Sequence, residues 1–421
     1  MPSLTHNTPA LRFPGYTGVW EQHKLFDCIQ KIIDFRGRTP KKLGMDWSEE
    51  GYLALSALNV KNGYIDFTQD AHYGNQALYD KWMAGNELHK GQVLFTTEAP
   101  MGNVAQVPDD KRYILSQRTI AFDVKANFLT EDFLATVLRT PTIFADLAAL
   151  SSGGTAKGIS QKSLASVDIG VPKDLQEQEK IAKTFSKLNG LINLHQRQTQ
   201  KLTELKQGLL HEMFPREGES VPRLRFPGFT DTWEQQKLDD LYIFAGSGGT
   251  PKSTNQQYYN GSIPFLGISD ITGRDITKTK KTITEEGLHH STAWIVPAGA
   301  ISLAMYASVG EIGILTHDTA TSQAFYNMVF DDDRVRDFIY YRLFKAAEQA
   351  EYEPLISTGT QRNLNAEKIK NFTVQVTSVD EMGAIGHFFR TLDDLINLHQ
   401  QQTEKLTELK KGLLQKMFPQ D

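Results

Sequence analysis

The chain has 421 residues, of which 40% are hydrophobic and 23% are charged, and its formal net charge is −5. These values fit an ordinary protein of two to four domains and argue against a nonspecific nucleic-acid coat, although they leave room for a local basic surface. The single cysteine, Cys28, excludes an internal disulfide, and neither a signal peptide nor a long apolar span is evident, so we expect a cytoplasmic protein without a membrane segment.

The chain opens on a motif that returns in its second half. Leu11–Thr17 reads LRFPGYT and Leu224–Thr230 reads LRFPGFT, and a Trp-Glu-Gln triplet follows each copy, at Trp20 and at Trp233. Weaker matches follow in chain order: Thr39–Lys41 with Thr250–Lys252, Leu53–Val60 with Pro264–Ile271, Ser116–Gln117 with Ser322–Gln323, and Gly154–Thr155 with Gly359–Thr360. The chain therefore contains one module twice.

Between these motifs, each module mixes short apolar runs with turns and helical stretches. Val93–Thr97 and Ile301–Met305 are typical of buried strands, and Thr130–Arg139 and Asp333–Glu348 are typical of helices. Turn residues are frequent between them. We expect each module to be an α+β domain with an irregular sheet.

A long helix is expected to close each module. Leu188–Pro215 and Leu392–Pro419 are identical at 21 of 28 positions, at a constant offset of 204. Apolar residues recur every three or four positions, as in a coiled coil, and a proline ends each segment. A helix over residues 177–214 would be about 57 Å long. Because such a helix cannot bury its apolar seam alone, we expect the two copies to pair, with antiparallel packing.

The residues expected to pair the helices and to dock partners are apolar, apart from one histidine in the middle of each helix. We interpret the histidines as a polar layer that fixes the register; a metal site is the alternative, but carboxylate or cysteine companions at ligand spacing are missing. The seam residues are Ile181, Phe185, Leu188, Ile192, His195, Leu202, Leu205, Leu209 and Met213, and then Ile385, Phe389, Leu392, Ile396, His399, Leu406, Leu409, Leu413 and Met417.

These patterns predict a pseudo-two-fold α+β protein with two repeated globular domains and two long helices that pair as an antiparallel coiled coil. The expected segments are a first domain over 1–176, a first helix over 177–215, a second domain over 216–379 and a second helix over 380–419. The opening motif and the closing helix are nearly identical in the two modules, whereas the residues between them differ. That contrast is expected if two domains share a scaffold but recognise different things.

Two basic clusters, one in each module, lie among Gly, Thr and Pro and are expected in exposed loops. The loops Ser151–Gln161 and Ser357–Asn363 add further hydrogen-bond donors. A solvated charge run is the alternative for either cluster, but a cluster in each module favours DNA, because phosphate contacts supply most of the affinity. The clusters are Lys31, Arg36, Arg38, Lys41 and Lys42, and Arg274, Lys278, Lys280 and Lys281. The candidate DNA-binding residues are Arg36, Arg38, Lys41, Lys42, Lys157, Gln161, Lys252, Arg274, Lys278, Lys280, Gln361, Arg362 and Asn363.

Motifs for nucleotide binding or catalysis are incomplete. Gly246–Ser253 differs from a phosphate-binding loop at Pro251, which lacks the N–H that such a loop needs. Phe244–Gly248 resembles the S-adenosylmethionine loop of amino-methyltransferases, but the chain contains no Pro-Pro pair, which their second motif requires. We therefore expect no catalytic residue, no resident cofactor and no metal site in this chain.

With these motifs in this order, the chain resembles the DNA-specificity subunits of type I restriction–modification systems. The resemblance spans nearly the full length and rests above all on the two Leu-Ile-Asn-Leu-His helices. Its other carriers are the repeated LRFPG opening with its Trp-Glu, Thr39-Pro40, Thr250-Pro251, Ile263–Leu266, Asp270-Ile271 and Ser357–Thr360. The first module departs from the pattern at Ser152–Thr155 and lacks the Ile-Pro strand start.

The resemblance implies two target-recognition domains, each of which reads one half of a bipartite site in double-stranded DNA, and helices that set the spacing of the half-sites. It implies two modification subunits that dock on the helices and methylate adenine with S-adenosylmethionine, and restriction subunits that use ATP and Mg²⁺. The chain itself would be non-catalytic. Two alternatives stay open: a coiled-coil scaffold that binds only proteins, and a stand-alone DNA methyltransferase.

Overall fold

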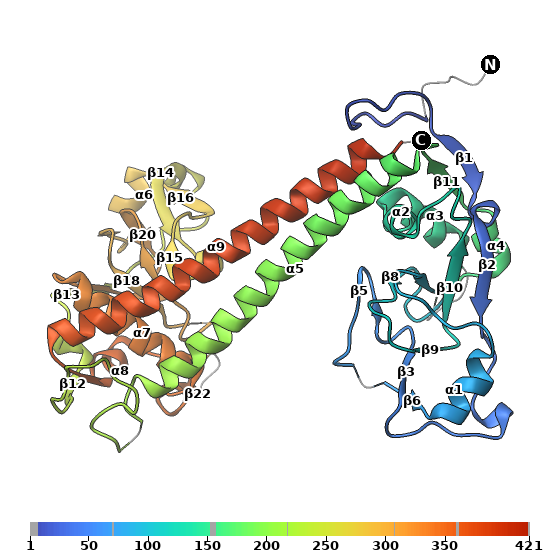
Figure 1. The fold of residues 1–421 in the computed structure, drawn as a ribbon. Helices are drawn as coiled ribbons and strands as arrows, with labels where there is room; N and C mark the ends of the chain where they lie inside the picture. The colour runs from blue at the N-terminus through green and yellow to red at the C-terminus, as the bar shows by residue number, and fades with distance from the viewer. Residues whose placement is uncertain are drawn as a thin grey trace. The chain divides into compact units, whose positions relative to one another are not determined.

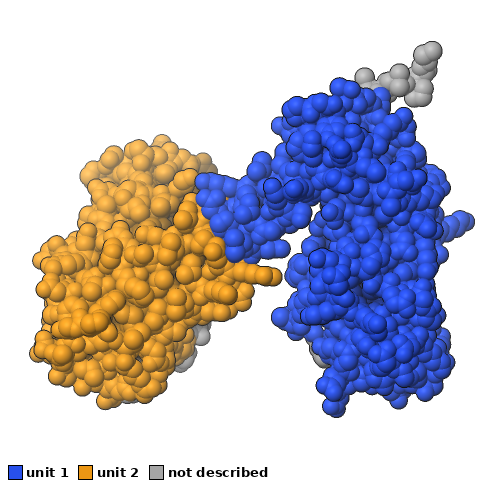
Figure 2. Space-filling model, viewed as in Figure 1, with its two compact units in different colours: residues 1–195, 402–421 blue, residues 196–401 orange. Residues whose placement is uncertain are grey.

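The computed structural model of the chain describes residues 7–69, 71–151, 157–216, 218–306, 308–358 and 362–419, with the backbone alone at 357, 358 and 362. These residues form two compact units, 1–195 with 402–421 and 196–401 (Figure 2). Each unit consists of one globular domain and portions of two long helices. The expected domain boundaries, which place each helix in a segment of its own, stay a prediction.

The first domain is built on a four-stranded antiparallel sheet in the order β2-β10-β7-β8 (Figure 1). Its strand β7 is buried throughout because both faces are covered: Phe95 belongs to the core shared with the long helices, and Leu94 belongs to a second core around α1. The elements are β1 (Glu21–Lys24), β2 (Ile29–Asp34), β3 (Tyr52–Leu55), β4 (Val60–Lys61), β5 (Tyr64–Ile65), β6 (Tyr73–Gly74), α1 (Gln76–Met83), β7 (Val93–Thr96), β8 (Val104–Gln106), β9 (Ile114–Leu115), β10 (Thr119–Val124), α2 (Glu131–Val137), α3 (Pro141–Leu150), α4 (Gln161–Ala165), β11 (Asp168–Val171) and α5 (Leu175–Glu212).

The second domain repeats this plan with a five-stranded sheet in the order β13-β21-β18-β19-β15. Its strand β18 is buried throughout, as β7 is in the first domain. The elements are β12 (Glu234–Lys237), β13 (Phe244–Ser247), β14 (Tyr259–Leu266), β15 (Asp275–Ile276), β16 (Lys281–Ile283), α6 (Glu285–His289), β17 (Ile295–Val296), β18 (Ile301–Ala304), β19 (Ile312–Leu315), β20 (Thr319–Thr321), β21 (Phe325–Val329), α7 (Asp333–Glu348), β22 (Ser357–Thr358), β23 (Arg362–Asn363), α8 (Ala366–Lys370), β24 (Thr373–Val376) and α9 (Val379–Met417).

The long helices α5 and α9 pack against each other in opposite directions. In the first unit, Phe185 near the start of α5 lies in one core with Phe418, just beyond the end of α9. In the second unit, Phe389 near the start of α9 lies in one core with Phe214, just beyond the end of α5. The start of each helix therefore meets the end of the other, and the predicted fold of two α+β domains with a pair of long antiparallel helices is confirmed.

The opening motif of each module anchors the start of its own closing helix. Arg12 donates hydrogen bonds of 2.6 and 2.8 Å to the carboxylate of Glu177 in the first turn of α5. Arg225 donates bonds of 2.6 and 2.7 Å to Glu381 in the first turn of α9. The two carboxylate side chains are 1% and 0% exposed. Buried charges require such partners, which explains why this Arg and this Glu occur in both copies.

The tryptophan of each opening motif packs on the end of the helix that closes the other module. Trp20 meets Phe418 edge-on, with the ring centroids 5.8 Å apart, and Trp233 meets Phe214 edge-on at 6.1 Å. All four side chains are buried. Each domain core is therefore completed by the helix of the other module, which accounts for the near identity of the two helices.

Two leucines that were expected in the helix seam are exposed instead. Leu205 and Leu409 are 49% and 51% exposed, so the prediction is wrong at both positions. A helix turns by about 100° per residue, so one step along the chain moves a side chain off the seam. In α5 the inward position belongs to Lys206, whose ammonium donates to Asp393 at 2.6 Å, and Tyr341 donates to the same carboxylate at 2.7 Å. The seam of the second unit is thus closed by a buried ion pair.

The other seam residues line the helix pair to different depths. Among the described residues, no group of three or more His, Cys, Asp or Glu side chains could hold a metal ion. The buried residues are Ile181, Phe185, Leu188, Ile192, Met213, Ile385, Phe389, Leu392, Ile396 and Met417, and the half-buried ones are His195, Leu202, Leu209, His399, Leu406 and Leu413.

No single helix within the described ranges is long and apolar enough to cross a membrane. The pair α2 and α3, bent by 70°, passes that test only when the two helices are taken together.

Candidate nucleic-acid interface

In the first domain, two of the predicted DNA-binding residues meet at one carboxylate. Arg36 follows the end of β2 and donates bonds of 2.8 and 2.6 Å to Asp34, and the amide of Gln161 donates to the same carboxylate at 2.6 Å. Arg36 also reaches the carbonyl of Ile159 at 3.3 Å. Burial alone would raise the pKa of Asp34, but the bonds from Arg36 and Gln161 lower it, so this carboxyl stays ionised and holds both side chains in place.

The other basic residues of this cluster have different roles. Arg38 is half-buried, because its guanidinium lies 4.2 Å from the ring centroid of Phe35 and donates to the carbonyl of Trp82. The prediction of an exposed loop is wrong for Arg38, because the partners that cover it include a residue far away in the sequence. Lys31 on β2 is exposed, and so are three lysines that follow that strand in the chain, Lys41, Lys42 and Lys157.

Beside Arg36 the surface of the first domain is hollowed. This hollow, with a volume of about 330 Å³, is lined by Arg36, Glu98, Gln117 and Arg118 and by the segment Gly158–Ser160. Arg118 Nε lies 2.9 Å from Glu98 Oε1, and both side chains are about half exposed. The hollow therefore presents two guanidinium groups, one carboxylate and one amide to solvent, a set that can recognise base edges as well as phosphates.

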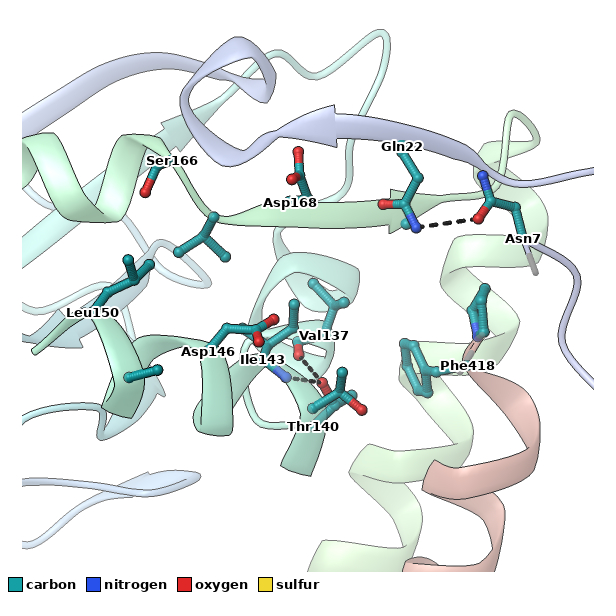
Figure 3. A pocket seen from close by; sticks show the side chains of 15 residues that line it. Asn7, Gln22, Val137, Thr140, Ile143, Asp146, Leu150, Ser166, Asp168 and Phe418 are labelled. Carbon is teal, nitrogen blue, oxygen red and sulfur yellow. Dashed lines mark hydrogen bonds between the residues drawn. The ribbon is translucent and has the colours of Figure 1, made fainter. Parts of the chain in front are cut away.

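A larger pocket in the same unit has the wrong charge for nucleic acid. Its volume is about 710 Å³, and it lies between α3, β11 and the residues that follow α9 (Figure 3). Its described lining contains the carboxylates Asp146 and Asp168 but no lysine or arginine. Because phosphate contacts require positive charge, we place the nucleic-acid interface at the hollow and the basic loops instead.

In the second domain, Arg274 is not a surface residue. It is 7% exposed and donates to Asp275, to Asp394 on α9 and to the carbonyl of Arg390. The prediction of an exposed loop is wrong here because Asp394 lies 120 residues away in sequence, and no local pattern reveals it. Arg274 therefore ties the second domain to α9.

Several lysines of the second domain do reach solvent. Lys278 and Lys280 are exposed between β15 and β16, and Lys281 is exposed at the start of β16 rather than in a loop. Lys252 is exposed beside Thr250, whose hydroxyl donates to the amide oxygen of Gln323 at 2.6 Å.

The remaining candidate residues are described only in part. Asn363 is half-buried and its backbone bridges to Tyr306. Gln361 and the side chain of Arg362 lie outside the described residues, as do 152–156 in the loop of the first domain and the pair Gly359–Thr360.

A family model for the type I restriction modification DNA specificity domain matches residues 19–204 and again residues 230–408. The chain belongs to this family. Each match covers one globular domain together with most of its closing helix, so the internal repeat of this specificity-family protein corresponds to two copies of the family's domain. The resemblance inferred from the sequence is confirmed.

Two relatives of the chain are also specificity subunits, and one solved structure shares its fold. The chain is 30% identical over 190 residues, 44% of each chain, to the type I restriction enzyme MjaIX specificity subunit of Methanocaldococcus jannaschii. It is 22% identical over 408 residues to the type I restriction enzyme HindI specificity subunit of Haemophilus influenzae, a match that covers 80% of this chain and 87% of the relative. Its fold is similar to the crystal structure of the type I restriction-modification S subunit from M. genitalium, with a TM-score of 0.66, 16% identity, and coverage of 98% of this chain and all of the other.

Some residues that organise this specificity-family fold were missed from the sequence. Asp34 was not among the predicted site residues, and the Glu98–Arg118 pair was not recognised, because its members are separated along the chain. The Arg12–Glu177 pair and its repeat could have been predicted from the sequence. Arg and Glu recur at matching positions of both copies although neither is required by helix periodicity.

Proposed function

We propose that the chain is the DNA-recognition subunit of a type I restriction–modification complex and that each domain reads one half of a bipartite target. In this proposal the helices α5 and α9 set the spacing of the half-sites. The chain itself is non-catalytic and works in the cytoplasm. Two modification subunits carry S-adenosylmethionine and methylate adenine, and restriction subunits use ATP and Mg²⁺.

The observation that carries the proposal is a shared frame with different exposed groups. The Arg–Glu anchor and the Trp–Phe contact recur in both units with nearly the same geometry. One exposed basic residue recurs, since Lys41 corresponds to Lys252 in the shared Thr-Pro-Lys motif. The others differ: Lys42 corresponds to Ser253, and Arg118 corresponds to Ala324. Two copies of one scaffold with different surface chemistry suit the recognition of two different half-sites.

Docking of two modification subunits is supported by leucines on the outer face of the helix pair. Six of them are between 39% and 51% exposed, and they form three pairs at the repeat offset of 204. A repeated set of exposed apolar side chains suits two equal docking sites. The first unit carries Leu191, Leu194 and Leu409, and the second unit carries their counterparts Leu395, Leu398 and Leu205.

The two other functions make different demands on the molecule. A protein-binding scaffold would not need the exposed lysines of both domains, and it would show no sequence-dependent retention of DNA when its partners are present. A stand-alone methyltransferase would transfer methyl groups to DNA as an isolated chain. A methyl-transfer assay on the isolated chain and a DNA-retention assay on the assembled complex therefore separate the three functions.

Replacing Lys278 and Lys280 together with alanine should weaken DNA binding by the assembled complex and flatten its salt dependence. Each lost phosphate contact reduces the slope of log affinity against log salt by about 1, so a slope smaller by about 2 is expected. Binding is measured by titrating target DNA at several salt concentrations. The matched control is Lys237→Ala, which removes an exposed lysine on β12 outside the basic loop. An unchanged slope for the double variant would refute the assignment of this loop.

A further inference from the structure

The two domains share one backbone frame at the hollow. In the first domain, Glu98 forms an isolated antiparallel bridge with Gly158. Next to this bridge, the amide of Ile159 donates to the carbonyl of Thr97 at 2.9 Å. In the second domain, Tyr306 forms the same bridge with Asn363, and the amide of Leu364 donates to the carbonyl of Met305 at 2.9 Å. Glu98 and Tyr306 therefore occupy equivalent places, each just after the central strand β7 or β18.

The side chains on this shared frame differ in chemistry. Glu98 pairs with Arg118, which directly follows the Ser-Gln pair that the two modules share. In the second module the residue after that pair is Ala324, so a charged pair in one domain corresponds to Tyr306 and an alanine in the other. A scaffold that is kept while its exposed groups change is what two readers of different half-sites require.

The backbone around Glu98 is built to hold this side chain at the surface. Ala99, the next residue, has φ +50°, a conformation that residues other than glycine rarely adopt and that concentrates at functional sites. Gly158 keeps the bridge close, since a Cβ there would lie 3.3 Å from the Cβ of Glu98. Arg36, fixed by Asp34, lines the same hollow as the pair. The backbone that carries Glu98 is therefore held by its surroundings, and Glu98 in turn positions Arg118.

A carboxylate at this position argues against a simple phosphate contact. Glu98 would repel a phosphate, whereas the amino group of a cytosine needs an acceptor such as a carboxylate. The arginine beside it matches the two acceptors on the major-groove edge of a guanine. The exposed ion pair stabilises the fold little, so its separation on binding costs little.

We propose that Arg118 and Glu98 read one G·C base pair in the half-site of the first domain. This inference rests on the proposed function and names the base pair that the first domain recognises. Arg118 donates to O6 and N7 of the guanine, and Glu98 accepts from the N4 amino group of the paired cytosine. The second domain, which carries Tyr306 at the equivalent position, does not read its half-site in this way.

The test is to map methylated adenines in a methylation-free host that expresses the modification subunit with the wild-type chain, Arg118→Ala, Arg118→Lys or Glu98→Gln. We expect a wild-type motif whose first-domain half contains a G·C pair. Arg118→Ala should reduce discrimination at that pair by about tenfold or more and leave the other half-site unchanged. Arg118→Lys should also relax it, because lysine keeps the charge but lacks the two-pronged geometry. Glu98→Gln should relax recognition at the same base pair only.

The matched controls are Arg223→Ala and Glu219→Gln, which break an exposed pair at 2.9 Å in the second unit. An unchanged second half-site shows that a variant has folded and assembled. If Arg118→Ala keeps full discrimination at every position, or weakens methylation equally at all sequences, the base-reading inference is overturned while the proposed function stands. If the wild-type chain directs no sequence-specific methylation, the proposed function fails and this inference fails with it.

Discussion

Replacing Arg225 with alanine should lower the free energy of unfolding of the second unit by about 3–5 kcal/mol. The variant leaves the carboxylate of Glu381 buried without its arginine, and an unpaired buried charge is costly. Arg12→Ala should have the same effect on the first unit, through Glu177. Chemical denaturation of the full chain measures the unfolding free energy, and a separate spectroscopic signal from each unit monitors its unfolding.

The matched control for this prediction is Arg223→Ala, which removes an exposed arginine two residues away. Its pair with Glu219 lies at the surface, so a loss of less than about 1 kcal/mol is expected. The double variant Arg225→Met with Glu381→Leu should recover much of the stability, because it removes both buried charges. Equal losses for Arg225→Ala and Arg223→Ala would mean that the buried pair does not anchor α9.

Replacing Leu191 and Leu395 together with aspartate should remove both modification subunits from the complex. The two leucines are 45% and 39% exposed and occupy equivalent positions of the repeat, so each single variant should remove one subunit. An apolar side chain at the centre of an interface can contribute more than 2 kcal/mol to binding, and the variant puts a charge in its place. The stoichiometry is read by native mass spectrometry of the assembled complex.

The matched control for the docking prediction is Leu58→Asp, an exposed leucine in the first domain. It should leave two modification subunits bound, since it lies outside the helix pair. Because the helix leucines are exposed in the free chain, neither aspartate should unfold it. A double variant that still carries two modification subunits would place the docking surface elsewhere on the chain.

The repeat made the architecture predictable, and local periodicity predicted the helices. Two long amphipathic segments of nearly identical sequence each needed a partner to cover the apolar seam. The two helices pair with each other and so cover both seams. At Leu205 the residue type predicted an inward position, but the side chain is exposed. Leucine is apolar and therefore suits a helix seam better than lysine does. Lys206 nevertheless faces inward, because its ammonium donates to Asp393 and Tyr341 donates to the same carboxylate.

The candidate interface was less predictable, because charge alone does not separate surface groups from buried ones. Arg36 and Gln161 were both expected to contact DNA, and they do lie together. Arg38 and Arg274 were expected for the same reason, but distant partners hold them in structural contacts. Single-sequence patterns give the residue types of such clusters, and only the fold gives their partners.

Sequencing of methylated adenines in a methylation-free host tests the central claim most directly. The host expresses the modification subunit with or without this chain. We expect a bipartite, asymmetric motif that disappears when the chain is absent, and exchange of residues 1–176 for another recognition domain should change one half of that motif only. Absence of adenine methylation from an assembled three-subunit complex would contradict the account and favour a protein scaffold.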